Sequence, residues 1–251
     1  MITHCSIDPD DLSAVGRLMA VVARDGVVTF DGVPDRPSLL RLGRAMLKVR
    51  THRDSEPDGI TVIHDRGKLA RRAGNAGLGH ERLSLHTESS ALPRPPELLM
   101  LYCAQAAASG GDCHLADGAV LAQELAQHHP DLLDVLCEPR NVLFGGAAGF
   151  LGSPLTVTGA RMSIRMRSDS LARYAPPLAR RLPEVHRILS RITISVRLQP
   201  GTGYLLSNTR WLHGREEYDA GRVMYRLLGD PRAGYEVLAG FPRPLQTVSA
   251  R

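Results

Sequence analysis

The sequence predicts a mainly β fold with flanking α-helices, arranged as a double-stranded β-helix, or jelly roll. Short segments in which apolar and polar residues alternate recur along the chain, most clearly in its second half. Helical spacing of apolar residues is limited to the N-terminus and to one insertion. With 251 residues the chain is long enough for a closed sheet with covering helices, so we expect one domain over residues 1–251.

The first half of the chain is expected to begin with helices and continue with strands. Its predicted elements are a helix that ends near Gly26, a strand at 27–30, a helix at 38–47, and strands at 60–63, 83–88, 98–103 and 112–115. Asp117 is placed to cap a further helix. Residues 50–80 are rich in glycine, arginine and aspartate, which predicts a long loop that could act as a lid over a site.

The second half is expected to be richer in strands. Its predicted elements are a glycine-rich loop at 145–152, a strand around 162–166, a helix at 176–189, and strands at 192–198, 204–207 and 222–229. His213 falls in a predicted loop between the last two strands. The segment 145–159, which includes the glycine-rich loop, is a second candidate for part of the lid.

Composition excludes several classes of function. Aromatic residues make up 4% of the chain, and the arginines behind the net charge of +5 are dispersed, which argues against nucleic-acid binding. The charge would favour small anionic molecules, or only aid solubility. No apolar run is long enough to cross a membrane. The four cysteines lack C-x-x-C spacing, and the N-terminus lacks a secretory signal, so we expect a cytoplasmic protein with reduced thiols. The sequence leaves room for a homo-oligomer.

Three residues could hold a metal ion. His86 and Glu88 are separated by one residue on a predicted strand, so both side chains would lie on one face. His213, far along the chain, would complete a set of two imidazoles and one carboxylate. This ligand set leaves open positions on the metal and is typical of non-haem iron(II) oxygenases. The H-x-E spacing alone is weak evidence, because it often occurs by chance.

Two arginines on one predicted strand suggest an anion beside that metal. Arg222 and Arg226 have even spacing, so both would share a face with Met224 and Leu228. An arginine on an otherwise apolar strand is costly unless it meets an anion. A dicarboxylate such as 2-oxoglutarate would supply one that suits the planar guanidinium. The alternative is an exposed strand face that carries two solvated arginines.

Several segments together resemble the TauD/TfdA-like, or clavaminate-synthase-like, family of Fe(II)/2-oxoglutarate-dependent dioxygenases. They are GVVTFDG (26–32), LHTESS (85–90), PPELLMLYC (95–103), GGDCHLADG (110–118), NTRWLHGR (208–215) and RVMYRLLGD (222–230). The order H-x-E, distant histidine, R-x-x-x-R is more specific than any one part, and the resemblance covers most of the chain. It implies a jelly-roll fold, with Fe(II) held by His86, Glu88 and His213.

The resemblance also implies a reaction, in which 2-oxoglutarate and O₂ serve to oxidise, most often to hydroxylate, a C–H bond. Arg222 would bind 2-oxoglutarate, with Arg226 as the fallback for that role. Cys113 stands where the family usually has a threonine that contacts the co-substrate, and a thiol is a weaker donor. Related halogenases have Gly or Ala in place of Glu88, so halogenation is not expected.

The resemblance leaves the substrate open. Arg226 and Arg165 favour a small carboxylate-bearing molecule, such as an amino acid or an intermediate of specialised metabolism, including antibiotic biosynthesis. Two alternatives remain at this stage. One is a cupin-like metal-dependent hydrolase or isomerase, which has no need for Arg222. The other is a non-catalytic jelly-roll binding module, which would bind no stoichiometric metal.

Overall fold

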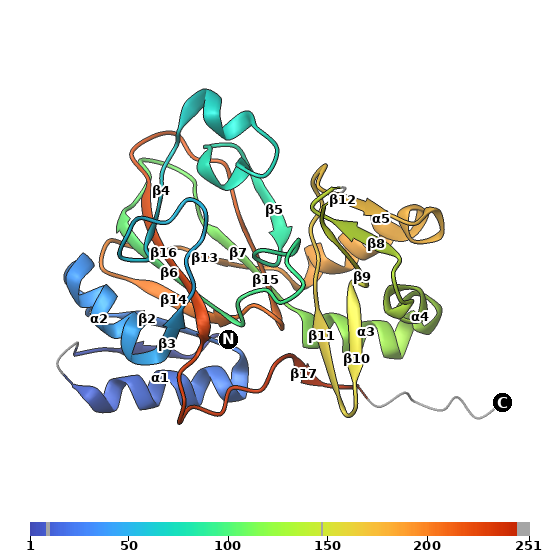
Figure 1. The fold of residues 1–251 in the computed structure, drawn as a ribbon, viewed down its shortest axis with the longest axis horizontal. Coiled ribbons are helices and arrows are strands. Elements are labelled where there is room, and N and C mark those ends of the chain that lie inside the picture. The colour runs from blue at the N-terminus through green and yellow to red at the C-terminus, as the bar shows by residue number, and fades with distance from the viewer. Residues whose placement is uncertain (9–10, 147, 245–251) are drawn as a thin grey trace.

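The computed structural model describes residues 1–8, 11–146 and 148–244, and shows a mixed α/β chain with several antiparallel sheets (Figure 1). Its elements in order are β1 (His4–Ser6), α1 (Leu12–Asp25), β2 (Val27–Asp31), α2 (Arg36–Met46), β3 (Leu47–Val49), β4 (Thr61–Ile63), the 3₁₀ turns η1 (Gly67–Arg71) and η2 (Ala76–Leu78), β5 (Leu83–His86), β6 (Leu98–Gln105), β7 (Cys113–Asp117), α3 (Gly118–His128), α4 (Pro130–Cys137), β8 (Val142–Phe144), β9 (Phe150–Gly152), β10 (Leu155–Thr158), β11 (Arg161–Ile164), β12 (Ala172–Tyr174), α5 (Pro176–Ile192), β13 (Ile194–Val196), β14 (Gly203–Ser207), β15 (Trp211–Arg215), β16 (Val223–Pro231) and β17 (Phe241–Pro242).

The largest sheet has the strand order β1-β2-β14-β6-β16-β3, with β4 also paired to β16. Helices α1 and α2 cover its outer face, where Leu18 and Leu39 pack against Met100 and Leu205. The sequence of β6 is continuously apolar because both faces of this strand are buried, each in a different core. Leu98, Met100 and Tyr102 face the helices, whereas Leu99, Leu101 and Cys103 face inward.

A smaller sheet, β13-β7-β15-β5, packs against the inner face of the large one. Leu115 of β7 and Trp211 of β15 join Leu99, Tyr204 and Met224 of the large sheet in one buried cluster. Strands β5 and β15, which carry His86 and His213, therefore belong to the sheet that faces β16, the strand that begins directly after Arg222. This pairing of sheets positions the site described below.

A separate layer covers the smaller sheet on its other side. Helices α3, α4 and α5 bury Leu125, Leu132 and Ile188 in a core shared with β8, β10 and β11 (Figure 1). Asp117 ends β7 and caps α3 by accepting a hydrogen bond from the Ala119 amide at 2.9 Å, which confirms the expected cap. None of the described helices is both long and apolar enough to cross a membrane.

Most expected elements are present, but three assignments from the sequence were wrong. His213 lies on strand β15 and not in a loop; all five residues of this strand are buried, so no alternating pattern marked it. Helix α5 continues to Ile192, in phase with Ile188 and Leu189, which shortens the strand expected at 192–198 to Ile194–Val196. Strand β5 ends at His86, so Glu88 lies beyond it. Helix α4 was not expected at all.

Candidate active site

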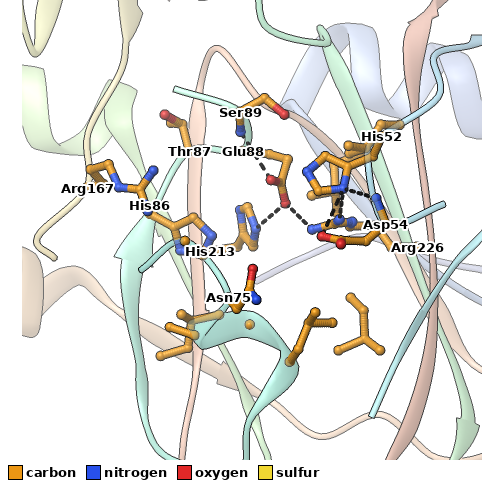
Figure 2. A pocket seen from close by; sticks show the side chains of 18 of the residues that line it. His52, Asp54, Asn75, His86, Thr87, Glu88, Ser89, Arg167, His213 and Arg226 are labelled. Carbon is orange, nitrogen blue, oxygen red and sulfur yellow. Dashed lines mark hydrogen bonds and ion pairs between the residues drawn. The ribbon is translucent and has the colours of Figure 1, made fainter. Parts of the chain in front are cut away.

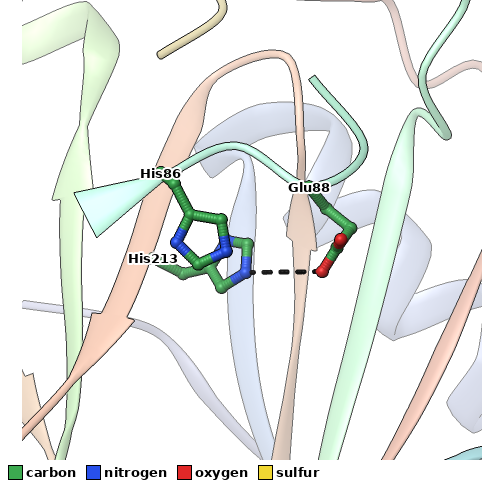
Figure 3. A group of neighbouring side chains, drawn as sticks. All are labelled: His86, Glu88 and His213. Carbon is green, nitrogen blue, oxygen red and sulfur yellow. Dashed lines mark ion pairs between the residues drawn. The ribbon is translucent and has the colours of Figure 1, made fainter. Parts of the chain in front are cut away.

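His86, Glu88 and His213 converge at one point (Figure 3). His213 on β15 is the register partner of His86 on β5, and the two ring centroids are 4.3 Å apart. The Nε2 atom of His213 lies 3.9 Å from Oε2 of Glu88. One ligand atom from each residue falls within 4.8 Å of the other two. The structure thus brings together the three residues that the sequence singled out.

Because β5 ends at His86, Glu88 reaches this point through a turn and not through strand geometry. Asn208 holds the turn: its Oδ1 accepts a hydrogen bond from the Glu88 amide at 2.7 Å, and its Nδ2 donates to the carbonyls of Glu88 and Pro96. Ser89 adopts a φ of 54°, which is unusual for a residue with a side chain, and its amide donates to Glu88 Oε1. The side chain of Asn208, which is 2% exposed, therefore fixes the backbone of Glu88.

The charge states of the three residues suit cation binding. Burial lowers the pKa of His86, and it lowers that of His213 to about 3, so both imidazoles are neutral near pH 7. The Nδ1 of His86 lies 2.9 Å from the Ser84 carbonyl; donation of its hydrogen there leaves the Nε2 lone pair free. Burial is the largest single influence on the pKa of Glu88 and raises it, but Arg226 and the neighbouring histidines together outweigh burial and lower that pKa to about 2.

This donor set fits a divalent cation. Two neutral imidazole nitrogens and one ionised carboxylate are the ligand types that mid-row transition metals accept, and all three come from one side of the ion. The buried Nδ1 of His213 has no hydrogen-bond partner among the described residues. The cluster opens onto a cavity of about 630 Å³, which leaves room for further ligands.

Charged side chains that the sequence did not single out also line this cavity (Figure 2). Arg167 and Asp169 form an ion pair at 2.5 Å on the His86 side of the cluster. His52, Asp54 and Asn75 belong to the segment 50–80, which supplies part of the cavity wall. In the sequence, His52, Asp54 and Asn75 were marked only by their place in a segment that was expected to cover a site.

Arg222 and Cys113 lie together in the same cavity. The guanidinium donates to the Cys113 thiol with a nitrogen–sulfur distance of 3.7 Å and lies over the ring of Tyr218, 5.5 Å from its centroid. Arg222 is 6% exposed, and no carboxylate within the described part of the chain pairs with it. Burial raises the pKa of Cys113, so the thiol is protonated and leaves the positive charge uncompensated.

Arg226 and Arg165 have different surroundings from each other. Arg226 pairs with Glu88 Oε2 at 2.5 Å, and its NH2 lies 3.4 Å from His52 Nδ1, while its buried Nε has no partner among the described residues. Arg165 donates to the carbonyls of residues 90, 92 and 93, stacks on a phenylalanine ring, and is not among the residues that line the cavity. The structure therefore brings Arg226, but not Arg165, to the site.

Arg215 ties the segment 50–80 to the strand that carries His213. This arginine is 3% exposed and donates to the carbonyls of Gly79, His80 and Glu81. It stands two residues after His213 on the same strand. The end of the cavity wall is thus fixed to the metal-ligand strand by a buried cation.

The fold and this site define the class of protein. The chain belongs to the family described as taurine catabolism dioxygenase TauD, TfdA family, whose model matches residues 5–148. The match includes His86 and Glu88, whereas His213 and Arg222 lie beyond it.

Individual relatives agree with this membership. The chain is 22% identical to gamma-butyrobetaine dioxygenase of Homo sapiens over 245 residues, which cover 88% of this chain and 60% of that protein. It is 26% identical to the enzyme of the same name from Pseudomonas sp. (strain AK-1) over 235 residues, covering 86% and 58%. The chain therefore spans about 60% of the length of these relatives.

Solved structures show the same fold. An asparagine oxygenase in complex with Fe(II), 2S,3S-3-hydroxyasparagine and succinate has a TM-score of 0.71 at 16% identity, covering 90% of this chain and 94% of that one. The non-heme iron oxygenase OrfP in complex with Fe and alpha-ketoglutaric acid has a TM-score of 0.66 at 15% identity, covering 96% and 100%. At these identities the likeness concerns the fold.

Proposed function

We propose that this protein is an Fe(II)- and 2-oxoglutarate-dependent dioxygenase that hydroxylates a C–H bond of a small carboxylate-bearing molecule, such as an amino acid. The observation that carries the proposal is the convergence of His86, Glu88 and His213 at the wall of a cavity. In this proposal the three side chains hold Fe(II), and their arrangement on one side leaves positions for a chelating keto acid and O₂.

The buried guanidinium of Arg222 supports 2-oxoglutarate as the chelating keto acid. A buried cation without a carboxylate partner is costly, and a distal carboxylate of the co-substrate would neutralise it. A metal-dependent hydrolase would need no such group, which disfavours that alternative. The thiol of Cys113 lies beside the same carboxylate in this arrangement.

The cavity also supports a charged substrate. Arg226 keeps a buried Nε without a partner among the described residues, so this N–H can donate to one oxygen of a substrate carboxylate while Arg226 remains paired with Glu88. Asp54, on the Arg226 side of the metal cluster (Figure 2), and Asp169, which is paired with Arg167, are carboxylates of the cavity wall beside which an ammonium group could lie. An amino acid carries both charges, and the asparagine oxygenase and OrfP structures contain amino acids of this kind. Because Arg165 is occupied by backbone carbonyls, we assign it no substrate role.

Iron held by His86, Glu88 and His213 would supply, together with O₂ and 2-oxoglutarate, the oxidising power for the reaction. The residues of the chain contribute position and charge. His86 and His213 remain neutral donors, Arg226 keeps Glu88 ionised, and Arg222 orients the co-substrate. The carboxylate of Glu88 fills the place that a halide would need, so the product is hydroxylated and not halogenated.

The proposal extends to the architecture. We infer that the two facing sheets form a double-stranded β-helix within a single domain over residues 1–251, and that residues 50–80 act as its lid. The contribution of this segment to the cavity wall supports the lid.

Two measurements test the proposal. Anaerobic addition of Fe(II) and then 2-oxoglutarate should produce the weak visible absorption of an iron–keto acid chelate, and amino acids supplied with O₂ should be screened for succinate release. Glu88→Ala should abolish both signals, because the cluster loses its charged ligand. Glu97→Ala is a matched control: Glu97 is not among the residues that line the cavity, so its loss should leave the chelate unchanged. A wild-type protein that forms no chelate contradicts the proposal.

A further inference from the structure

Tyr204 is a buried residue that still reaches the cavity. It lies on β14, is 1% exposed, and lines the same cavity as Arg222 and Cys113. In register Tyr204 stands opposite Leu101 on β6, and Leu101 stands opposite Arg226 on β16. Cross-strand partners share a face, so Tyr204 and Arg226 flank Leu101 on the inner face of the large sheet.

The side chain of Tyr204 shares the cavity wall with Cys113, Arg222 and Glu88. It lies close enough to all three for them to act on the pKa of its hydroxyl. Burial raises the pKa of Tyr204 well above its ordinary value, with Arg222 acting in the opposite direction. The phenol is therefore protonated at any pH near neutrality and is available as a donor.

We propose that the Tyr204 hydroxyl, together with Arg222, binds the distal carboxylate of the 2-oxoglutarate co-substrate; this inference rests on the function proposed above. A buried carboxylate needs donors for both of its oxygens. Arg222 supplies one set, while the adjacent Cys113 offers only a weak thiol donor. Tyr204 supplies the strong neutral donor, and its bond to a carboxylate oxygen would be charge-assisted.

Tyr204→Phe tests this role, because it removes the hydroxyl and keeps the ring that fills the core. A hydrogen bond to a charged group corresponds to a loss of affinity of roughly 10- to 100-fold. Calorimetric titration of 2-oxoglutarate into Mn(II)-loaded protein, without O₂, should show that loss while Mn(II) affinity stays unchanged. The readout is binding, so it does not depend on a known substrate.

Tyr102→Phe is the matched control. Tyr102 is also buried, on β6, but its hydroxyl donates to the Val33 carbonyl at 3.0 Å on the helix-covered face of the sheet. This variant loses a comparable hydrogen bond away from the cavity and should bind 2-oxoglutarate as the wild type does.

A second ligand locates the contact. 2-Oxovalerate has the keto acid end of 2-oxoglutarate but no distal carboxylate, so wild type and Tyr204→Phe should bind it equally. Unchanged affinity of Tyr204→Phe for 2-oxoglutarate overturns the proposal, and so does an equal loss for both keto acids. A wild-type protein that binds Mn(II) but prefers 2-oxovalerate to 2-oxoglutarate overturns it together with the role of Arg222, whereas failure to bind any keto acid rejects the proposed function as well.

Discussion

Replacing Arg222 with methionine should weaken 2-oxoglutarate binding on the order of 100-fold. The guanidinium is 6% exposed, and within the described residues its one hydrogen bond goes to a thiol, so most of its donors are free for an incoming carboxylate. Two hydrogen bonds to that carboxylate, at the lower end of about 1.5 kcal/mol each, give roughly 3 kcal/mol, which is on the order of a 100-fold change in dissociation constant.

The same substitution should not destabilise the apo-protein. Methionine takes the place of the arginine stem from Cβ to Nε with a flexible apolar side chain, and it removes a buried cation that has no carboxylate partner in the described part of the chain. The melting temperature of the apo-protein should therefore stay the same or rise. A clear fall would mean that the guanidinium has a structural role beyond its contacts with Cys113 and Tyr218.

The assay is an anaerobic titration of Fe(II)-loaded protein with 2-oxoglutarate, followed by the visible absorption of the chelate. 2-Oxovalerate serves as the reference ligand, and its affinity should be the same for wild type and Arg222→Met. Equal affinity of the two proteins for 2-oxoglutarate would refute the assignment. A loss of the same size with both keto acids would show that Arg222 acts on the metal site or the fold instead.

Three further predictions concern the support of the site and the fold. Asn208→Ala frees the Glu88 turn and should lower Mn(II) affinity about 10- to 100-fold in calorimetry; wild-type affinity would contradict this support role. Arg215→Met removes the hydrogen bonds to the carbonyls of Gly79 and Glu81 and should speed proteolytic cleavage near residues 76–81; an unchanged cleavage rate would show that these bonds do not hold the segment in place. Leu205→Ala, at a fully buried position beneath α1 and α2, should cost about 2–5 kcal/mol of unfolding free energy in denaturant titrations, where a loss well below 1 kcal/mol would count against that packing.

The metal cluster could be predicted from the sequence because its chemistry is visible in residue types. Two histidines and a glutamate in the order of a known family are informative without any geometry, and the apolar neighbours of Arg222 marked it as a buried cation. The backbone geometry expected at Glu88 was nevertheless wrong. Strand alternation was expected to aim it at the metal, whereas β5 ends at His86 and a hydrogen-bonded turn performs that task.

The supporting residues could not be predicted, because their roles depend on contacts between distant segments. Asn208 bonds to Glu88 across 120 positions of sequence, and no local pattern marks an asparagine for that role. Tyr204 had the pattern of an ordinary core residue, and it is one, except that it also forms part of the cavity wall. For Arg165 the residue type suggested a ligand, yet nearby carbonyl groups satisfy it. Whether a polar side chain finds hydrogen-bond partners within the protein depends on the tertiary structure, which brings distant segments together.

The contacts of Arg215 bear on how a substrate could gain access. They anchor residues 79–81 beside a metal ligand, so that end of the long segment behaves as a pivot. Whatever opening the reaction demands then falls to the portion from residue 50 to residue 75, which contributes His52, Asp54 and Asn75 to the wall. A change at this pivot would reach the strand that carries His213, so in the proposed enzyme the admission of substrate and the integrity of the metal centre would depend on the same buried arginine.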